Sequence, residues 1–205
     1  WWKFRIPERQ DDIGLRAHVT PFQKPHPPIG VAGVSPNSPT LKMAGQLGWI
    51  PMSINLAPPV QIKTHWDSIE EGALEAGTQP DRSLWRVARE VFIADTTSEA
   101  RRMMQEGTLA RDFERYFLPM LAHDGRLGIF KIDPDMPDSD VTIDYLMDNV
   151  FIVGSADEVT QKLNDLNGEL GGFGTLLAMG HEWDPYDAWY ESMSVLVKEV
   201  LPKVD

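Results

Sequence analysis

The stretch that indicates the fold is PHPPIGVAGVSPNSPTLKMAGQLG, residues 25–48. Its apolar run PIGVAG, residues 28–33, lies between prolines and a cluster of Ser, Pro and Asn. Because apolar and polar residues do not alternate here, the run predicts a strand buried on both faces, as in parallel sheets. Residues 38–47 then predict a short helix that ends at Gly48.

The same order of strand and helix recurs along the chain. We expect further main strands near 48–54, 86–94 and 174–179, and helices near 60–76, 95–117, 155–170 and 184–202. Thr97 or Ser98 is expected to cap the 95–117 helix, and Ser155 forms an S-x-x-E capping box with Glu158 after the short run FIVG. Alternating strands and helices indicate an α/β fold with right-handed crossovers. About four β/α units would make half of a (β/α)8 TIM barrel, and an independent doubly wound sheet would fit equally well.

Two segments interrupt this pattern. Residues 1–27 have no lasting period and predict a loop that lies over the surface. Residues 118–141 are dense in Gly, Pro and Asp and are too long for a plain connector, which indicates an insertion that is either a functional lid or mobile. We expect residues 1–205 to form part of a single domain.

Composition excludes several classes of function. The chain has 205 residues, of which 42% are hydrophobic, and its net charge of −12 argues against a nucleic-acid partner. The lack of cysteine excludes disulfides and thiolate metal sites. No apolar run approaches the roughly 20 residues that span a bilayer. No signal peptide is recognisable, so a cytoplasmic protein is expected, and the start at Trp1 rather than Met indicates a fragment of something longer.

The ends of the expected strands carry the candidate chemistry, because sites in α/β folds collect at the carboxyl ends of parallel strands. The first strand ends in GVSPNS, where Gly33 would let a ligand approach the backbone. Ser35, Ser38 and the first N–H groups of the following helix could hold a phosphate. Alternatively, Ser35 or Ser38 only caps that helix. The sequence contains neither GxGxxG nor a P-loop.

Two other strand ends offer groups for a substrate pocket. Met52 could face a flat ring, although a plain core position is the alternative. The last strand ends in MGHEWD, which places Met179, His181 and Trp183 within reach of a substrate. His181 could donate a hydrogen bond or move a proton near neutral pH, whereas the alternative is a turn with a packed Trp183. No metal site is expected, because the histidines show neither HxxxH nor HExxH spacing.

The motifs KPHPPIGVAG, SPNS, AGQLG, VFIADTTSEAR, FIVGSADEV and GGFGTLLAMGHEWDP occur in this order along the chain. In order and spacing they resemble the bacterial luciferase-like flavin monooxygenases, and among these the limonene-monooxygenase-type group. The aromatic opening WWKF is also similar to a stretch that those proteins carry before the PHPP segment. The resemblance extends over nearly all 205 residues.

This resemblance implies the C-terminal half of a (β/α)8 barrel that binds reduced FMN, supplied by a separate flavin reductase. The intact protein would insert one oxygen atom from O2 into a hydrophobic, terpenoid-like molecule through a flavin C4a-hydroperoxide. The catalytic residues and much of a homodimer interface would lie in the absent N-terminal half. The alternatives are an F420-dependent oxidoreductase of the same superfamily and a non-catalytic flavin-binding protein. By resemblance, the positions around the flavin phosphate are Ala32, Gly33, Val34, Ser35, Ser38 and Thr40.

Overall fold

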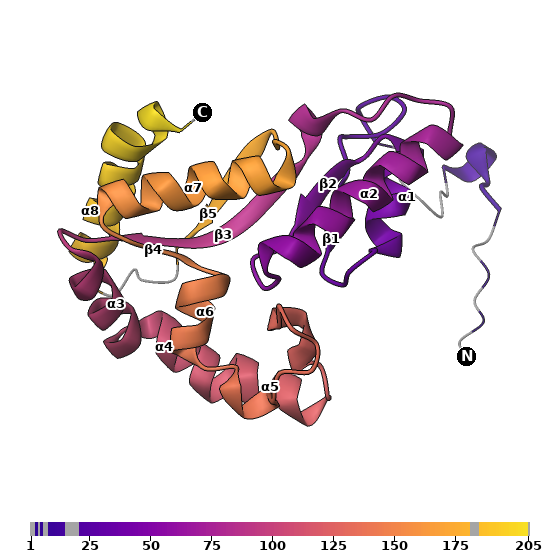
Figure 1. The fold of residues 1–205 in the computed structure, drawn as a ribbon. Coiled ribbons are helices and arrows are strands. Elements are labelled where there is room, and N and C mark those ends of the chain that lie inside the picture. Colours follow the sequence, from indigo (N-terminus) through magenta and orange to yellow (C-terminus); the bar gives the residue numbers. More distant parts are fainter. Residues whose placement is uncertain (1–2, 4, 6–7, 15–20, 181–184, 205) are drawn as a thin grey trace.

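A parallel sheet forms the centre of the computed structural model, which describes residues 1–205 except 1–2, 4, 6–7, 15–20, 181–184 and 205 (Figure 1). Within the described residues, the strands are β1 (Gly30–Gly33), β2 (Ile50–Ser53), β3 (Arg86–Ile93), β4 (Ile152–Gly154) and β5 (Thr175–Met179). Strands β1, β2 and β3 are neighbours in that order, and both β4 and β5 pair with β3. The predicted α/β fold and its main strands are confirmed. The run FIVG, residues 151–154, contains one more strand, β4, which was not among the expected main strands.

Strand β3 connects the rest of the sheet. Strand β2 pairs with Arg86 and Val87, β5 pairs with residues 86–90, and β4 pairs with residues 91–93. All residues of β3 after the first are buried. In Figure 1 strand β3 starts beside β1, β2, α1 and α2. It ends near α3 and α8.

Three helices form a core with one face of the sheet: α1 (Pro39–Leu47), α2 (Pro59–Glu75) and α7 (Ala156–Leu170). Each was expected from its caps and turn residues, and Gly48 ends α1 in the left-handed conformation with φ of 64°. The buried side chains of this core include Leu41, Ile62, Ile69, Trp85, Val87, Val91, Leu163 and Leu166. The C-terminal helix α8 (Tyr186–Val195) contacts the far end of β3, where the Ser192 hydroxyl accepts a hydrogen bond from the Ile93 N–H at 2.9 Å.

Helices α1 and α2 approach so closely that their backbones touch. A Cβ atom on Gly45 would lie 2.1 Å from the carbonyl oxygen of Ile69, and one on Gly72 would lie 2.0 Å from that of Lys42. Real Cβ atoms do not approach backbone atoms this closely, so only glycine fits at both positions. These two glycines therefore set the distance between the helices.

A second group of helices follows β3, and here one prediction was wrong. The expected single helix over 95–117 is divided into α3 (Thr97–Glu106) and α4 (Thr108–Asp112), which continues through a π-helical turn (Phe113–Phe117) into α5 (Leu118–His123). The break lies at Gly107, whose extended backbone (φ −92°, ψ −166°) is incompatible with a continuous helix.

The N-cap of α3 is Thr96 and not Thr97 or Ser98 as expected, because its hydroxyl accepts the Glu99 N–H at 3.1 Å. The hydroxyl of Thr97 has other partners. It donates to the Glu158 carboxylate and accepts the Ser155 N–H at 3.2 Å. Half of the predicted capping box of α7 is confirmed, since the Ser155 hydroxyl accepts the Glu158 N–H at 3.4 Å, but the Ser155 N–H donates to Thr97 instead of Glu158. The Glu158 side chain, however, turns to Thr97.

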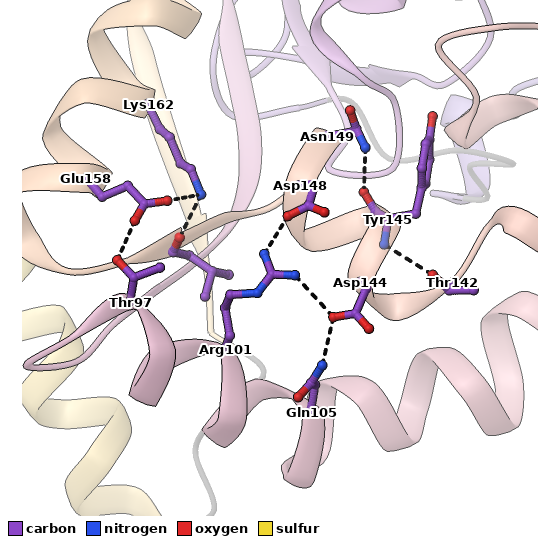
Figure 2. A network of polar contacts seen from close by, with 11 residues as sticks. Thr97, Arg101, Gln105, Thr142, Asp144, Tyr145, Asp148, Asn149, Glu158 and Lys162 are labelled. Atoms are coloured by element: carbon purple, nitrogen blue, oxygen red, sulfur yellow. Dashed lines mark hydrogen bonds and ion pairs between the residues drawn. The ribbon is translucent and has the colours of Figure 1, made fainter.

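Figure 2 shows polar side chains that join α3 to α6 (Ile143–Asn149) and to α7. Lys162 lies between the Glu158 carboxylate and the carbonyl oxygen of Val153, at 2.8 Å from each. Burial alone would raise the pKa of Glu158, but hydrogen bonds from Lys162 and Thr97 outweigh it and lower that pKa. The position of α3 against β4 and α7 is therefore held by charge-assisted hydrogen bonds as well as by apolar packing.

Residues 118–141 are anchored to a second hydrophobic core. Besides α5 they contain short 3-10 helices at Leu127–Phe130 and Asp138–Asp140. Leu121, Leu127 and Phe130 are buried together with Phe92 of β3. Lys131 adds an ion pair with Asp138 at 2.6 Å. Whether this segment acts as a lid, and whether 1–27 covers the surface, stay predictions.

Replacing Gly72 with alanine should lower the free energy of unfolding by about 3 kcal/mol or more, because the new methyl group meets the Lys42 carbonyl. The matched control is Gly168→Ala in α7, where a Cβ atom meets nothing within 4 Å. That change should raise the free energy of unfolding by about 0.5–1 kcal/mol. Chemical denaturation of both variants of the natural full-length protein tests the pair. Equal effects would contradict the close helix contact.

Candidate functional site

The turn between β1 and α1 brings several donors to the carboxyl edge of the sheet. Ser38 is the N-cap of α1: its hydroxyl accepts the Leu41 N–H at 3.4 Å and its carbonyl oxygen accepts the Lys42 N–H at 3.0 Å. Pro39 has no N–H and fits the first helical position. The N–H of Thr40 has no acceptor within the helix, so it points out of the positive end of α1.

The predicted phosphate contacts differ in accessibility. Ser35 and Thr40 are exposed and Val34 is half-buried, whereas Ser38 is only 2% exposed and its hydroxyl is engaged in the cap. A Cβ atom on Gly33 would lie 2.5 Å from the Leu41 side chain and 2.8 Å from the Ser38 hydroxyl. Glycine at position 33 thus lets α1 pack against β1. Among the predicted contact residues, the accessible side-chain donors are the hydroxyls of Ser35 and Thr40.

Helix α2 holds this turn at two points. The Thr64 hydroxyl accepts the Asn37 N–H at 2.9 Å and donates to the carbonyl oxygen of Gln61 at 2.7 Å. Asn37 has a φ of 52°, in the left-handed region that costs a non-glycine residue about 1 kcal/mol. The next residue, His65, contacts the carbonyl oxygen of Ser35 through Nε2 at 3.0 Å.

A fully buried chain of hydrogen bonds lies behind His65. The Trp85 indole donates to the Ser53 hydroxyl at 2.9 Å, and that hydroxyl lies 2.9 Å from Nδ1 of His65. A carbonyl oxygen can only accept, so Nε2 of His65 carries the proton that it donates to Ser35. Nδ1 then accepts from Ser53, whose oxygen already receives the indole proton. Each group in this series therefore donates to the next, from Trp85 to Ser53, from Ser53 to His65, and from His65 to the exposed turn.

Burial keeps His65 neutral. It lowers the pKa of His65, and the charge of Arg89 acts in the same direction, which outweighs the hydrogen bond to Ser35 that alone would raise it. Burial also lowers the pKa of Arg89, to about 10, against the attraction of Glu169. Arg89 is 1% exposed and lines a cavity of about 180 Å³ beside α7, and its Nη2 has no hydrogen-bond partner among the described residues.

The opposite face of the sheet is partly open, which corrects the expectation that β1 is buried on both faces. Gly33, Ser53 and Val87 are register partners on the helix-covered face, so Ala32 and Met52 point to the other side. On β5, Met179 pairs with Glu90 and shares this second face. Ala32 is exposed, Met52 is half-buried and Met179 is 36% exposed. Among the described residues, helices cover only one side of β1, and the other side is open.

The structure thus places three predicted residues, Ala32, Met52 and Met179, on one face of the sheet. The other two expected pocket residues, His181 and Trp183, lie outside the described residues.

Three polar residues of this region were missed by the sequence reasoning: His65, Asn55 and Glu90. Glu90 is 1% exposed on β3 and accepts a hydrogen bond from the Asn55 side chain just beyond β2. A carboxylate within the apolar run of β3 was the available signal for Glu90. A histidine on the apolar face of α2, three residues after Ile62, was the signal for His65.

The described residues contain no group of three or more His, Asp or Glu side chains that could hold a metal ion. They also contain no helix long and apolar enough to cross a membrane.

A parallel α/β sheet with exposed hydrogen-bond donors after one strand is common to a broad class of ligand-binding folds. Comparison with known proteins narrows it. The sequence model of the luciferase-like monooxygenases matches residues 9–172, so the chain belongs to the luciferase-like monooxygenase family.

Named relatives support this assignment. The 3,6-diketocamphane 1,6-monooxygenase of Pseudomonas putida is 38% identical over 198 residues, which cover 96% of this chain and 52% of the relative. The limonene 1,2-monooxygenase of Rhodococcus erythropolis is 28% identical, over 90% of this chain and 45% of the relative. The chain therefore spans about half the length of the curated relatives that it matches.

A solved structure agrees with these matches. It is the oxygenating constituent of the 3,6-diketocamphane monooxygenase from the CAM plasmid of Pseudomonas putida, a type II Baeyer-Villiger monooxygenase in complex with FMN. It superimposes with a TM-score of 0.80 at 40% identity, over 88% of this chain and 50% of that chain.

The lowered pKa of His65 predicts a pH dependence of stability. Below its ordinary value of about 6.5, unfolded chains bind a proton that the folded state does not, so the free energy of unfolding falls as the pH falls. The slope from this group is at most about 1.4 kcal/mol per pH unit, is about half of that at pH 6.5, and fades within about one pH unit above it. Denaturation of the wild type and His65→Gln between pH 7.5 and 5.5 measures it. Identical slopes for both proteins would refute a neutral, buried His65.

Proposed function

We propose that this chain is part of an FMN-dependent, two-component monooxygenase that uses O2 and acts on a hydrophobic, terpenoid-like small molecule. The observation that carries this proposal is the match to a monooxygenase in complex with FMN, over 88% of the chain at 40% identity. The accessible donors of the β1–α1 turn support it independently, because they suit a phosphate group.

The residues of the turn fit the phosphate of FMN. The hydroxyls of Ser35 and Thr40 and the Thr40 N–H would donate to the phosphate, and the positive end of α1 would favour its charge. Ala32, Gly33, Val34 and Ser38 complete the proposed contact set, with Ser38 acting through the cap of α1. Reduced flavin supplies the activation of oxygen when bound. The protein residues bind the cofactor, orient it and exclude water.

The open face of the sheet is the proposed substrate side. Met52 and Met179 lie on it and offer apolar, adaptable surface for a compact hydrophobic molecule. His181 and Trp183 follow β5 and are proposed as further pocket residues. The names of the relatives, diketocamphane and limonene monooxygenases, are consistent with a terpenoid-like substrate.

The remaining parts of the proposal concern what completes the protein. We infer that this chain is the C-terminal half of a (β/α)8 barrel, that an N-terminal half closes over the open face, and that the intact protein is a cytoplasmic homodimer served by a flavin reductase. In that assembly 1–27 forms a surface loop and 118–141 an insertion or lid. This chain matches only 52% and 45% of the lengths of the two relatives named above, which supports a missing half.

The decisive experiment is cofactor binding and turnover by the natural full-length protein. Titration should give saturable binding of FMN. Reduced FMN from a flavin reductase and ¹⁸O2 should put one labelled oxygen atom into a bicyclic terpenoid ketone. Tight binding of F420 without binding of FMN would favour an F420-dependent oxidoreductase. Binding of FMN without any product from a panel of terpenoids would favour a flavin-binding protein without catalysis.

Ser35→Ala should weaken FMN binding by about 1–2 kcal/mol, because a hydroxyl that donates to a charged phosphate is lost. The matched control is Ser98→Ala, which removes an exposed hydroxyl at the second position of α3. Fluorescence titration of both variants gives the affinities. An unchanged affinity in Ser35→Ala would remove Ser35 from the site.

Residues 1–205 produced alone should associate, because apolar groups on the open face of the sheet are exposed to water. The natural full-length protein should give one defined oligomer. Light scattering after size exclusion compares the two. A stable monomer of residues 1–205 would count against a missing half.

A further inference from the structure

We propose that Thr64 and His65 of α2 are positioning residues for the flavin phosphate, because they fix the turn that carries its donors. This inference rests on the proposed function and concerns the same site. Neither residue belongs to the set expected from the sequence. Both act through the backbone of Ser35 and Asn37 and not by touching the cofactor.

The two contacts fix the peptide units on both sides of Pro36. His65 binds the carbonyl oxygen of Ser35 at 3.0 Å, which sets the peptide before Pro36, and Thr64 binds the N–H of Asn37 at 2.9 Å, which sets the peptide after it. The held carbonyl of Ser35 restricts the backbone that carries the Ser35 side chain, and the rotamers open to a side chain depend on its backbone. A pre-organised turn loses little entropy when it binds an anion.

The chain behind His65 indicates a role beyond packing. His65 lies on the face of α2 that also carries Ile62 and Ile69, where an apolar residue would pack without needing polar partners. Burying Ser53, His65 and the indole N–H of Trp85 is costly unless every group is paired, and here each one is. The last hydrogen bond of this series leaves the core, because its acceptor Ser35 lies in an exposed turn.

Substitutions of His65 separate its two contacts. In His65→Gln the side-chain amide reaches the position of Nε2 and can still donate to Ser35. In His65→Asn the shorter amide reaches only the position of Nδ1, beside Ser53. We expect FMN affinity to fall less than about threefold in His65→Gln and about tenfold or more in His65→Asn. A role in stability alone predicts equal losses of FMN affinity in the two variants.

Substitutions of Thr64 provide a second, independent test. Thr64→Val keeps the shape but removes both hydrogen bonds of the hydroxyl, and Thr64→Ser restores them. The control is Thr78→Val, which removes a hydroxyl that donates to the Ala73 carbonyl near the other end of α2, at 3.1 Å. We expect Thr64→Val to weaken FMN binding about fivefold or more. Thr64→Ser and Thr78→Val should bind as the wild type does.

Riboflavin, which lacks the phosphate, is the discriminating ligand. The natural full-length protein should be titrated with FMN and with riboflavin, and its melting temperature measured in every variant. Positioning of the phosphate predicts that His65→Asn and Thr64→Val lose affinity for FMN while their affinity for riboflavin stays within twofold of the wild type. Equal losses for both ligands, or losses that follow the melting temperature, overturn the inference. If His65→Asn does not fold, the Thr64 series decides.

Failure of the proposed function has a different signature. A wild-type protein that binds neither flavin, or binds riboflavin as tightly as FMN, has no phosphate site at this turn. A wild type that prefers FMN, with Thr64→Val retaining that preference in full, keeps the proposed function and rejects the positioning role.

Discussion

Every described strand except β1 is hydrogen-bonded directly to β3, so the pairing of this one strand determines where the other elements lie. Strand β2 ends level with Val87 and β5 ends level with Glu90, so these two strands flank the first part of β3. Beyond them, residues 91–93 pair with β4 and extend to the helices after β3. Strand β3 contributes buried side chains to both hydrophobic cores and so connects them.

The candidate site combines two kinds of constraint. Apolar packing places α1 and α2 on the sheet, and a few buried polar groups then set the conformation of the β1–α1 turn. The packing fixes position to within the size of a side chain, whereas the hydrogen bonds fix the direction of individual peptide groups. A site that recognises a phosphate needs both, because its donors must converge on the oxygens of one group.

Local patterns predicted what depends on neighbours in the sequence. Runs rich in apolar residues predicted the strands, and Ser38 and Ser155 marked the helix starts correctly. The errors came from distant partners. Thr97 does not cap α3 because its hydroxyl bonds Glu158, 61 positions away, and the role of His65 depends on Ser35, 30 positions away. The open side of β1 could not be foreseen from an apolar run, since the run is the same whether or not a second layer covers it.

The glycine contact between α1 and α2 has a consequence for how the site can evolve. Gly45 lies seven residues after the cap Ser38, so about 10 Å of rigid helix separates the contact from the turn. A larger residue at position 45 or 72 that did not unfold the protein would tilt α1 and carry its first turn away from Thr64 and His65. Selection for a ligand at the first turn of α1 would therefore preserve Gly45 near the other end of that helix and Gly72 on α2, although both lie outside the turn.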